Sequence, residues 1–256
     1  MIDVVRVAVR LPAARREEAI ARLLALVPSG FDERAAGELI ELGAYVHPDE
    51  ADAIRAVFRD AVVEPVPPGW EDRWRAFHHA VIAGGLWVGP PWEFPPGDLP
   101  AVVVEPGRAF GTGAHPTTRL CLELLARLPA KGSLLDVGCG SGVLAIAAVR
   151  LGFDPVVAVD VDPVAVDVAR SNASANGVAV EVLEADATVG DRHRADAVVA
   201  NIARVTVERV LERVAASHAI TAGYLASERP AAPGWQPVER IELDGWAADH
   251  LRRETV

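Results

Sequence analysis

A glycine-rich turn near the middle of the chain could hold a nucleotide-like ligand. The stretch DVGCGSG at 136–142 joins an apolar segment to a helix-forming one. Glycine lets the backbone pass close to a ligand, and the following helix offers unpaired N–H groups at its start. Such a turn also serves plain helix–strand packing, so a second signal is needed. Asp160 provides it, because it follows the apolar run VVAV at the distance where a carboxylate accepts hydrogen bonds from ribose hydroxyls.

Two kinds of ligand suit this spacing, a nicotinamide dinucleotide and S-adenosylmethionine. Dinucleotide sites usually place the pattern Gly-x-Gly-x-x-Gly on the first strand of a domain, where it seats a pyrophosphate. Here Gly138, Gly140 and Gly142 alternate strictly, and Asp136 precedes them. A carboxylate beside that loop would repel a pyrophosphate but can help hold an ammonium group, directly or through water. S-adenosylmethionine carries an ammonium group and no phosphate, so the sequence favours the methyl donor.

Further polar residues stand where strands are predicted to end. Asp162 directly precedes Pro163 and is the better N-cap for the next helix, which leaves Asp160 for the ribose. Asp186 follows the segment VLEA, where the adenine amine would need an acceptor, although an ordinary loop aspartate is an equal alternative. Asn201 ends the apolar run VVA and is expected to face the ligand cleft, with loop capping as the alternative.

Strands and helices alternate from residue 101 onward. The predicted strands are 101–105, 133–138, 155–162, 179–186, 196–202 and 219–226, with helices at 117–128, 143–151, 163–175 and 203–216. This alternation with short loops predicts a parallel, doubly wound α/β sheet. Ligands bind such a sheet at the carboxyl ends of its strands, which is where the polar residues above are predicted to lie.

Residues 1–66 predict a separate small domain. Their strands and helices follow in the order β-α-β-β-α-β, which is typical of a ferredoxin-like α+β module. The segment contains 8 Lys+Arg against 12 Asp+Glu and none of the cofactor signals. We therefore expect a substrate-recognition domain whose charge favours a basic protein partner.

A stretch rich in proline and tryptophan, 67–100, separates this module from the predicted cofactor-binding domain at 101–256. Its proline pairs indicate a linker with structure of its own. Trp70, Trp74 and Phe77 have the spacing of one helix face, which favours packing onto a domain over contact with a substrate.

Composition narrows the class of partner. The 256 residues carry a net charge of −11, which is the wrong sign for binding a phosphate backbone, so we expect no direct nucleic-acid binding. The first residues lack the apolar stretch of a secretory signal, and no apolar run is long enough for a bilayer, which predicts a cytoplasmic protein without membrane contact. Two cysteines without ligand-like spacing predict free thiols and no metal site. We expect a monomer.

Four stretches of the chain together carry a family resemblance. They are EPGRAFGTGAHPTTRLCLELL at 105–125, LLDVGCGSGVLAIAAVRLG at 134–152, VAVDVDPVAVDVARSNASANGV at 157–178 and VVANI at 198–202. They resemble the PrmA family of class I methyltransferases, which methylate ribosomal protein L11 at the base of the factor-binding stalk. The segment FGTGAHPTT is the most telling, because the glycine loop and the acidic residue are shared by class I methyltransferases in general. The element order of the first 66 residues also agrees with the substrate-recognition module of that family.

The resemblance implies a Rossmann-like fold and cofactor contacts from Thr118, Gly138, Asp160 and Asn201. It also implies methyl transfer from S-adenosylmethionine to amino groups of ribosomal protein L11, on lysine side chains, the N-terminal amine or both. The alternatives are a methyltransferase for a small molecule or another protein, and a dehydrogenase-like or non-catalytic nucleotide-binding module. Asn201 is our candidate for orienting the acceptor amine. His115 could instead shuttle the proton, or it could simply shape and cap the turn.

The sequence departs from the family pattern near its end. The segment at 190–196 is short, and little room remains after residue 226 for the usual helix. The last two predicted strands, 236–243 and 246–253, would then close the sheet with less cover. This departure bears on substrate choice more than on the cofactor, because the cofactor loops lie earlier in the chain.

Overall fold

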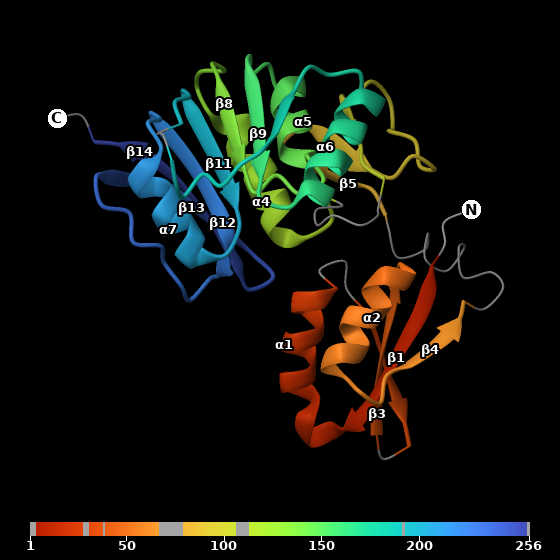
Figure 1. Ribbon diagram of the computed structural model, residues 1–256. Coiled ribbons are helices and arrows are strands. Elements are labelled where there is room, and N and C mark those ends of the chain that lie inside the picture. The colour runs from red at the N-terminus through yellow and green to blue at the C-terminus, as the bar shows by residue number, and fades with distance from the viewer. Residues whose placement is uncertain are drawn as a thin grey trace. The chain divides into compact units, whose positions relative to one another are not determined.

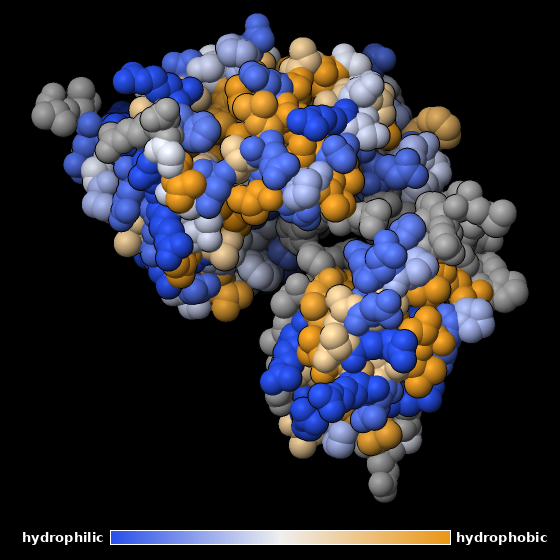
Figure 2. Space-filling view, in the orientation of Figure 1, coloured by the Kyte–Doolittle hydropathy of each residue, from blue (hydrophilic) through white to orange (hydrophobic). Residues whose placement is uncertain are grey.

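The chain folds into two compact units, Met1–Phe77 and His78–Val256 (Figure 1). The computed structural model describes residues 4–27, 31–37, 39–66, 79–105, 113–190 and 193–254. Within these ranges, no helix is both long and apolar enough to span a bilayer. Each unit has its own hydrophobic core, so each can be understood from its own sequence pattern. On the face of each unit shown in Figure 2, hydrophilic and hydrophobic residues are mixed.

The first unit is the predicted ferredoxin-like module. Its elements are β1 (Val5–Pro12), the short 3-10 helix η1 (Ala13–Arg15), α1 (Arg16–Leu26), β2 (Asp32–Ala36), β3 (Leu39–Val46), α2 (Pro48–Val57) and β4 (Val62–Pro65). The antiparallel sheet has the order β2-β3-β1-β4, and both helices cover one of its faces. Alternate residues of β1, namely Val7, Val9 and Leu11, are buried in the core with Leu23 of α1 and Ile54 of α2, as a half-buried strand requires.

Residues 79–105 belong to the second unit. They form a three-stranded sheet of β5 (Val81–Ala83), β6 (Leu86–Gly89) and β7 (Ala101–Val103). Leu86, Val88 and Val102 are fully buried in the large core of this unit. The described part of the predicted linker is therefore packed structure, because its short apolar runs lie between the prolines and are buried. Trp70, Trp74 and Phe77, predicted to form one helix face, lie outside the described residues.

The second unit is built around a seven-stranded sheet with helices on both faces. Its strands are β8 (Leu134–Val137), β9 (Val156–Asp160), β10 (Glu181–Glu184), β11 (Ala197–Asn201), β12 (His218–Leu225), β13 (Trp235–Leu243) and β14 (Trp246–Arg253), in the order β10-β9-β8-β11-β12-β14-β13. The first five strands in this order run parallel, and β14 lies antiparallel between β12 and β13. The predicted doubly wound α/β fold is thus confirmed, with an antiparallel pair at one edge.

Four helices cover this sheet. They are α4 (Pro116–Arg127), α5 (Val143–Arg150), α6 (Pro163–Ala175) and α7 (Arg204–Arg213). The apolar residues of α4, α5 and α6 join one core cluster, and those of α7 join the other. Helix α5 contacts both α4 and α6 as well as the sheet, which explains why its sequence VLAIAAV is apolar on all sides. No helix forms over 226–234, as expected, but α4 packs against β12, β14 and β13, so these last strands are covered by an element from earlier in the chain.

Candidate functional site

The predicted site residues converge at the carboxyl ends of three neighbouring strands. In the sheet, β8 lies between β9 and β11, and Val137 of β8 is in register with Val159 and Ala200. The next residue of β9 is Asp160 and the next of β11 is Asn201, while β8 leads into the glycine-rich loop. The alternation of strands and helices therefore places all three features at one edge of the sheet.

The glycine-rich loop is held tightly against β9. The backbone N–H groups of Gly138 and Cys139 both donate to the carbonyl of Val159, at 2.9 and 3.1 Å. Gly138 has a φ of 69°, and a Cβ added there would lie 2.3 Å from a side-chain carbon of Ile202. Gly142, also at positive φ, caps the N-terminus of α5. The loop thus needs glycine for its conformation and for its close approach to the turn after β11.

Asp160 lies beside this loop as predicted. One oxygen of its carboxylate accepts a hydrogen bond from the Gly140 amide at 2.9 Å, and the other accepts from the Asp162 amide at 3.0 Å. The Asp162 side chain caps α6 by accepting from Val164 N at 2.9 Å, which confirms the cap predicted for this residue. Each oxygen of Asp160 retains a second acceptor position, so the carboxylate can fix the loop and still receive ribose hydroxyls.

Asp136 is placed differently from a residue that contacts a ligand. Its side chain is almost fully buried, and its Oδ2 accepts a hydrogen bond from Ala145 N of α5 at 3.1 Å. Burial, reinforced by the charge of Asp160 and opposed by this hydrogen bond, raises the pKa of Asp136 to about 7. This contact ties β8 to α5, and a role for Asp136 in holding an ammonium group, directly or through water, stays a prediction.

This burial gives a prediction for the pH dependence of stability. The pKa of Asp136 is higher in the folded chain than in the unfolded one, so its protonated carboxyl contributes to stability at low pH. This contribution is fully present below the unfolded pKa and is lost as pH rises through about 7. Asp136→Asn keeps an acceptor for Ala145 N but cannot ionise. In chemical unfolding, the free energy of unfolding of the variant relative to that of the wild type should therefore rise by up to ~4 kcal/mol between about pH 4 and about pH 8. A difference that does not change with pH would show that the carboxylate is ionised throughout.

Thr118 and Asn201 lie far apart in the sequence and meet in the folded unit. Asn201 Nδ2 donates to Thr118 Oγ1 at 3.3 Å, and the Thr118 side chain is buried. Asn201 Oδ1 is also buried and has no hydrogen-bond partner among the described residues. A buried acceptor without a donor costs about 1–3 kcal/mol, so its position suits an N–H group supplied by a ligand. The sequence alone indicates Asn201 at a strand end, whereas Thr118 is suggested only by the family resemblance.

His115 caps helix α4. Its Nδ1 accepts from Thr117 N at 3.3 Å and lies 2.8 Å from Thr117 Oγ1, and its ring meets Trp246 edge-on with centroids 5.0 Å apart. Burial lowers the pKa of His115 below its usual value, which favours the neutral ring at pH 7. The capping role, one of the two roles considered from sequence, is therefore confirmed, whereas a proton-shuttle role stays a prediction.

Substitution of His115 separates these roles. Asparagine is among the best N-cap residues, so His115→Asn should keep the cap, whereas His115→Ala should lower the free energy of unfolding by ~1 kcal/mol. If the ring serves only as the cap, the Asn variant should retain turnover within about threefold of the wild type. Steady-state turnover and thermal unfolding of both variants provide the check. A fall in kcat of about 100-fold in a stably folded Asn variant would instead identify a proton shuttle.

Asp186 follows β10, the strand next to β9, and its exposed carboxylate serves its own loop. Oδ1 accepts hydrogen bonds from the amide and hydroxyl of Thr188 at 2.8 and 2.6 Å. These two bonds hold the pKa of Asp186 below its usual value. The loop role considered from sequence is present, and recognition of adenine stays a prediction for this residue.

Two asparagines that sequence reasoning missed, Asn172 of α6 and its C-cap residue Asn176, hold segments that pack against this helix. Asn172 Nδ2 donates to the carbonyl of Ser141 in the glycine-rich loop at 2.9 Å. Asn176, one turn later, accepts from Val103 N at 2.8 Å and donates to Val103 O at 2.6 Å, which fastens β7. Both side chains are buried on the inner face of the helix. The sequence feature that could have identified them is the four-residue spacing of two asparagines on a helix face that is otherwise apolar.

The Asn172 contact predicts a positioning effect. Asn172→Ala removes the only described side-chain hydrogen bond to the Ser141 carbonyl, so the loop should lose order and the affinity for S-adenosylmethionine should fall about 10-fold. Calorimetric titration with S-adenosylhomocysteine measures this change. Ser174→Ala, at an exposed position of the same helix, is the matched control and should bind normally. Equal affinities for both variants would show that the loop holds its shape without Asn172.

Comparison with known proteins agrees with this architecture. A solved structure of a ribosomal protein L11 methylase from Lactobacillus delbrueckii subsp. bulgaricus aligns with 69% of this chain and 100% of its own, at 26% identity and a TM-score of 0.62. The larger unit has the fold of a class I, Rossmann-like methyltransferase, and this chain also carries a small additional sheet domain.

Curated relatives are similar to part of this chain in sequence. A ribosomal protein L11 methyltransferase of Symbiobacterium thermophilum is 42% identical over 195 residues, which cover 70% of this chain and 64% of the relative. One of Vibrio campbellii is 50% identical over 113 residues, covering 43% and 38%. The matched part thus spans less than two thirds of these relatives' length.

A family model extends over the same region. The model described as "Ribosomal protein L11 methyltransferase (PrmA)" matches residues 50–228, which include every predicted site residue from His115 to Asn201. This match covers more than half of the chain and contains the glycine-rich loop and the ends of β9 and β11. The chain therefore belongs to the ribosomal protein L11 methyltransferase (PrmA) family.

Proposed function

We propose that the chain transfers methyl groups from S-adenosylmethionine to amino groups of ribosomal protein L11. The observation that carries this proposal is a juxtaposition at one edge of the sheet. The glycine-rich loop and Asp160 form a cradle for a nucleoside, and the unpartnered Oδ1 of Asn201 lies at the end of a nearby strand. Membership of the family supplies the substrate class. Lysine side chains and the N-terminal amine are both acceptors of this kind.

The residues present fit the methyl donor. Asp160 would receive the ribose hydroxyls, and the N-terminus of α5 would face the carboxylate of the methionine part. Thr118 and Asn201 would border the reacting end, since their side chains meet there. When bound, S-adenosylmethionine supplies a methyl group on a sulfonium, which an amine nitrogen can displace directly.

Asn201 suits the acceptor nitrogen because an amide oxygen carries no charge. An amine has a pKa near ~10.4, so it must lose a proton before it can act as a nucleophile. A carboxylate at this position would stabilise the ammonium form and raise that pKa further. The neutral Oδ1 of Asn201 can accept an N–H and direct the nitrogen lone pair without this penalty. Positioning of this kind is worth about 7 kcal/mol or more of the barrier in well-oriented reactions.

The N-terminal module is the part we propose to recognise the protein substrate. Residues 1–66 have an excess of acidic side chains, 12 against 8 basic ones. Ribosomal proteins are typically basic, so complementary charge would speed encounter, with an effect that weakens as salt rises. We expect the reaction to take place in the cytoplasm, where ribosomal proteins are made.

The experiment is a methyl-transfer assay with purified ribosomal protein L11. The full chain is incubated with labelled S-adenosylmethionine and L11, and the modified residues are identified by mass spectrometry. We expect label on amino nitrogens of L11, and less of it with the Asp160→Ala variant at the same concentration of S-adenosylmethionine. A parallel incubation with a bacterial lysate tests the alternative substrates: label confined to the small-molecule fraction, with none on L11, would overturn the proposal. Binding of NADH in preference to S-adenosylhomocysteine would overturn the cofactor.

A further inference from the structure

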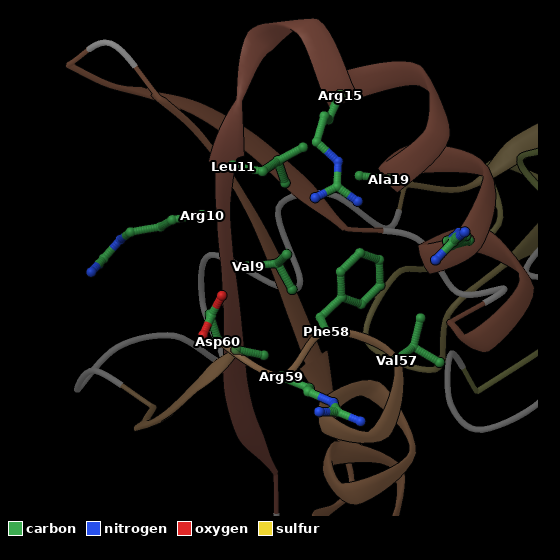
Figure 3. Close-up of a pocket in the computed structure, with 11 residues that line it drawn as sticks. Val9, Arg10, Leu11, Arg15, Ala19, Val57, Phe58, Arg59 and Asp60 are labelled. Atoms are coloured by element: carbon green, nitrogen blue, oxygen red, sulfur yellow. The ribbon is translucent and has the colours of Figure 1, made fainter.

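The N-terminal module contains a pocket between its first strand and its two helices. It has a volume of about 240 Å³ and lies among β1, the start of α1 and the end of α2 (Figure 3). Val9, Leu11 and Ala19 on its inner side are buried, and the half-buried ring of Phe58 lies across it. Arginines surround this apolar interior. The pocket therefore has an apolar interior with positively charged side chains around it.

Among the residues that the structure describes, four of the eight arginines of residues 1–66 line this pocket, together with a single acidic residue, Asp60. Arg10 points away from the centre in Figure 3 and donates to Glu41 at 2.7 Å, so it adds little charge to the interior. The positive charge comes from Arg15, Arg22 and Arg59, all of which are exposed.

These three guanidinium groups supply the N–H donors of the pocket. Arg59 has no ion pair among the described residues. Arg15 and Arg22 also interact with other groups, and each guanidinium carries five N–H donors in a planar group. A carboxylate is the group that this planar donor set fits best, through paired N–H···O bonds.

We propose that this pocket binds a carboxylate of the protein substrate, carried on an otherwise apolar stretch of that protein. This inference rests on the proposed function, and it adds a specific acidic anchor to the general attraction for a basic protein. The pocket is smaller than the ~300–1,000 Å³ typical of small-molecule sites, which favours a single side chain or chain end. A run of RNA phosphates is disfavoured because the rest of the module is acidic.

Charge reversal tests the pocket in the full-length chain. Arg15→Glu, Arg22→Glu and Arg59→Glu replace exposed side chains, so folding should be preserved, and each is compared with the wild type in methylation of purified ribosomal protein L11. The expected result is a KM for L11 raised about 10-fold, with kcat and the affinity for S-adenosylhomocysteine unchanged. Arg55→Glu is the matched control, since this exposed arginine of α2 lies outside the pocket and the variant changes the net charge equally. Its KM should stay within about twofold.

The outcomes separate this inference from the function on which it rests. If the wild type does not methylate L11, the proposed function fails and the inference fails with it. Methylation with the same KM in the pocket variants as in Arg55→Glu would overturn the inference alone. So would loss of affinity for an oligouridylate probe in the pocket variants with an unchanged KM for L11, because that result assigns the pocket to RNA.

Charge reversal on L11 identifies which of its carboxylates binds in the pocket. Each Asp or Glu of L11 is changed to Lys in turn, and the C-terminal carboxylate is amidated in a separate sample. The partner is the group whose loss raises the KM of the wild type, and a partner Lys should restore the KM of Arg59→Glu. Failure of every such change to raise the wild-type KM would contradict the proposal.

Discussion

Replacing Gly138 with valine is expected to abolish S-adenosylmethionine binding, with an affinity loss of at least ~100-fold. The backbone here has a φ of 69°, which a β-branched residue rarely adopts, and the added Cβ would lie 2.3 Å from the Ile202 side chain. The displaced loop would lose its hydrogen bonds to the carbonyl of Val159. The backbone amides of the loop would then shift, and so would the turn that follows Asn201. Calorimetric titration with S-adenosylhomocysteine provides the measurement.

A second glycine separates backbone strain from this collision. Gly177 has a φ of 62°, but a Cβ there would meet nothing within 4 Å. Gly177→Val should therefore lower stability by ~1–3 kcal/mol through strain and leave cofactor affinity unchanged. In the milder variant Gly138→Ala, adding Ile202→Ala should restore part of the binding, because it removes the colliding side chain. Normal binding by a folded Gly138→Val variant would show that the loop is not part of the cofactor site.

Replacing Asp160 with alanine is expected to weaken S-adenosylhomocysteine binding by about 1–3 kcal/mol, roughly 5- to 150-fold. Two effects add in this variant. The ribose hydroxyls lose a charged acceptor, and the Gly140 amide loses the oxygen that holds it at 2.9 Å. Asp160→Asn keeps one oxygen acceptor, so its loss of affinity should be smaller than that of the alanine variant.

Asp162 is the matched control for Asp160. It lies two residues away, and its carboxylate caps α6 through Val164 N. Asp162→Ala should lower the free energy of unfolding by ~1 kcal/mol through loss of the cap, with cofactor affinity unchanged. Calorimetry and thermal unfolding of the two alanine variants should therefore show opposite patterns. Equal affinity of Asp160→Ala and the wild type would remove Asp160 from the site.

The sequence by itself predicted the fold and the edge of the sheet that carries the site. Alternating apolar runs and helix-forming segments are local patterns, so the ferredoxin-like order and the doubly wound sheet could be inferred without coordinates. Strand ends are also local features. Because parallel strands end at one edge, Asp160, Asn201 and the glycine-rich loop could be placed together from the sequence alone.

The tertiary structure decided which atoms these residues present and to what. Residues 79–100 were predicted as part of a proline-rich linker, yet they pack into the second unit, because burial of short apolar runs depends on distant partners. The same reason explains why Asp136 bonds to α5 and why Asn172 holds the glycine-rich loop. The bond between Thr118 and Asn201 joins residues that are 83 positions apart. The arginine pocket likewise gathers residues from separate elements, and no local pattern in a sequence specifies how such elements pack against one another.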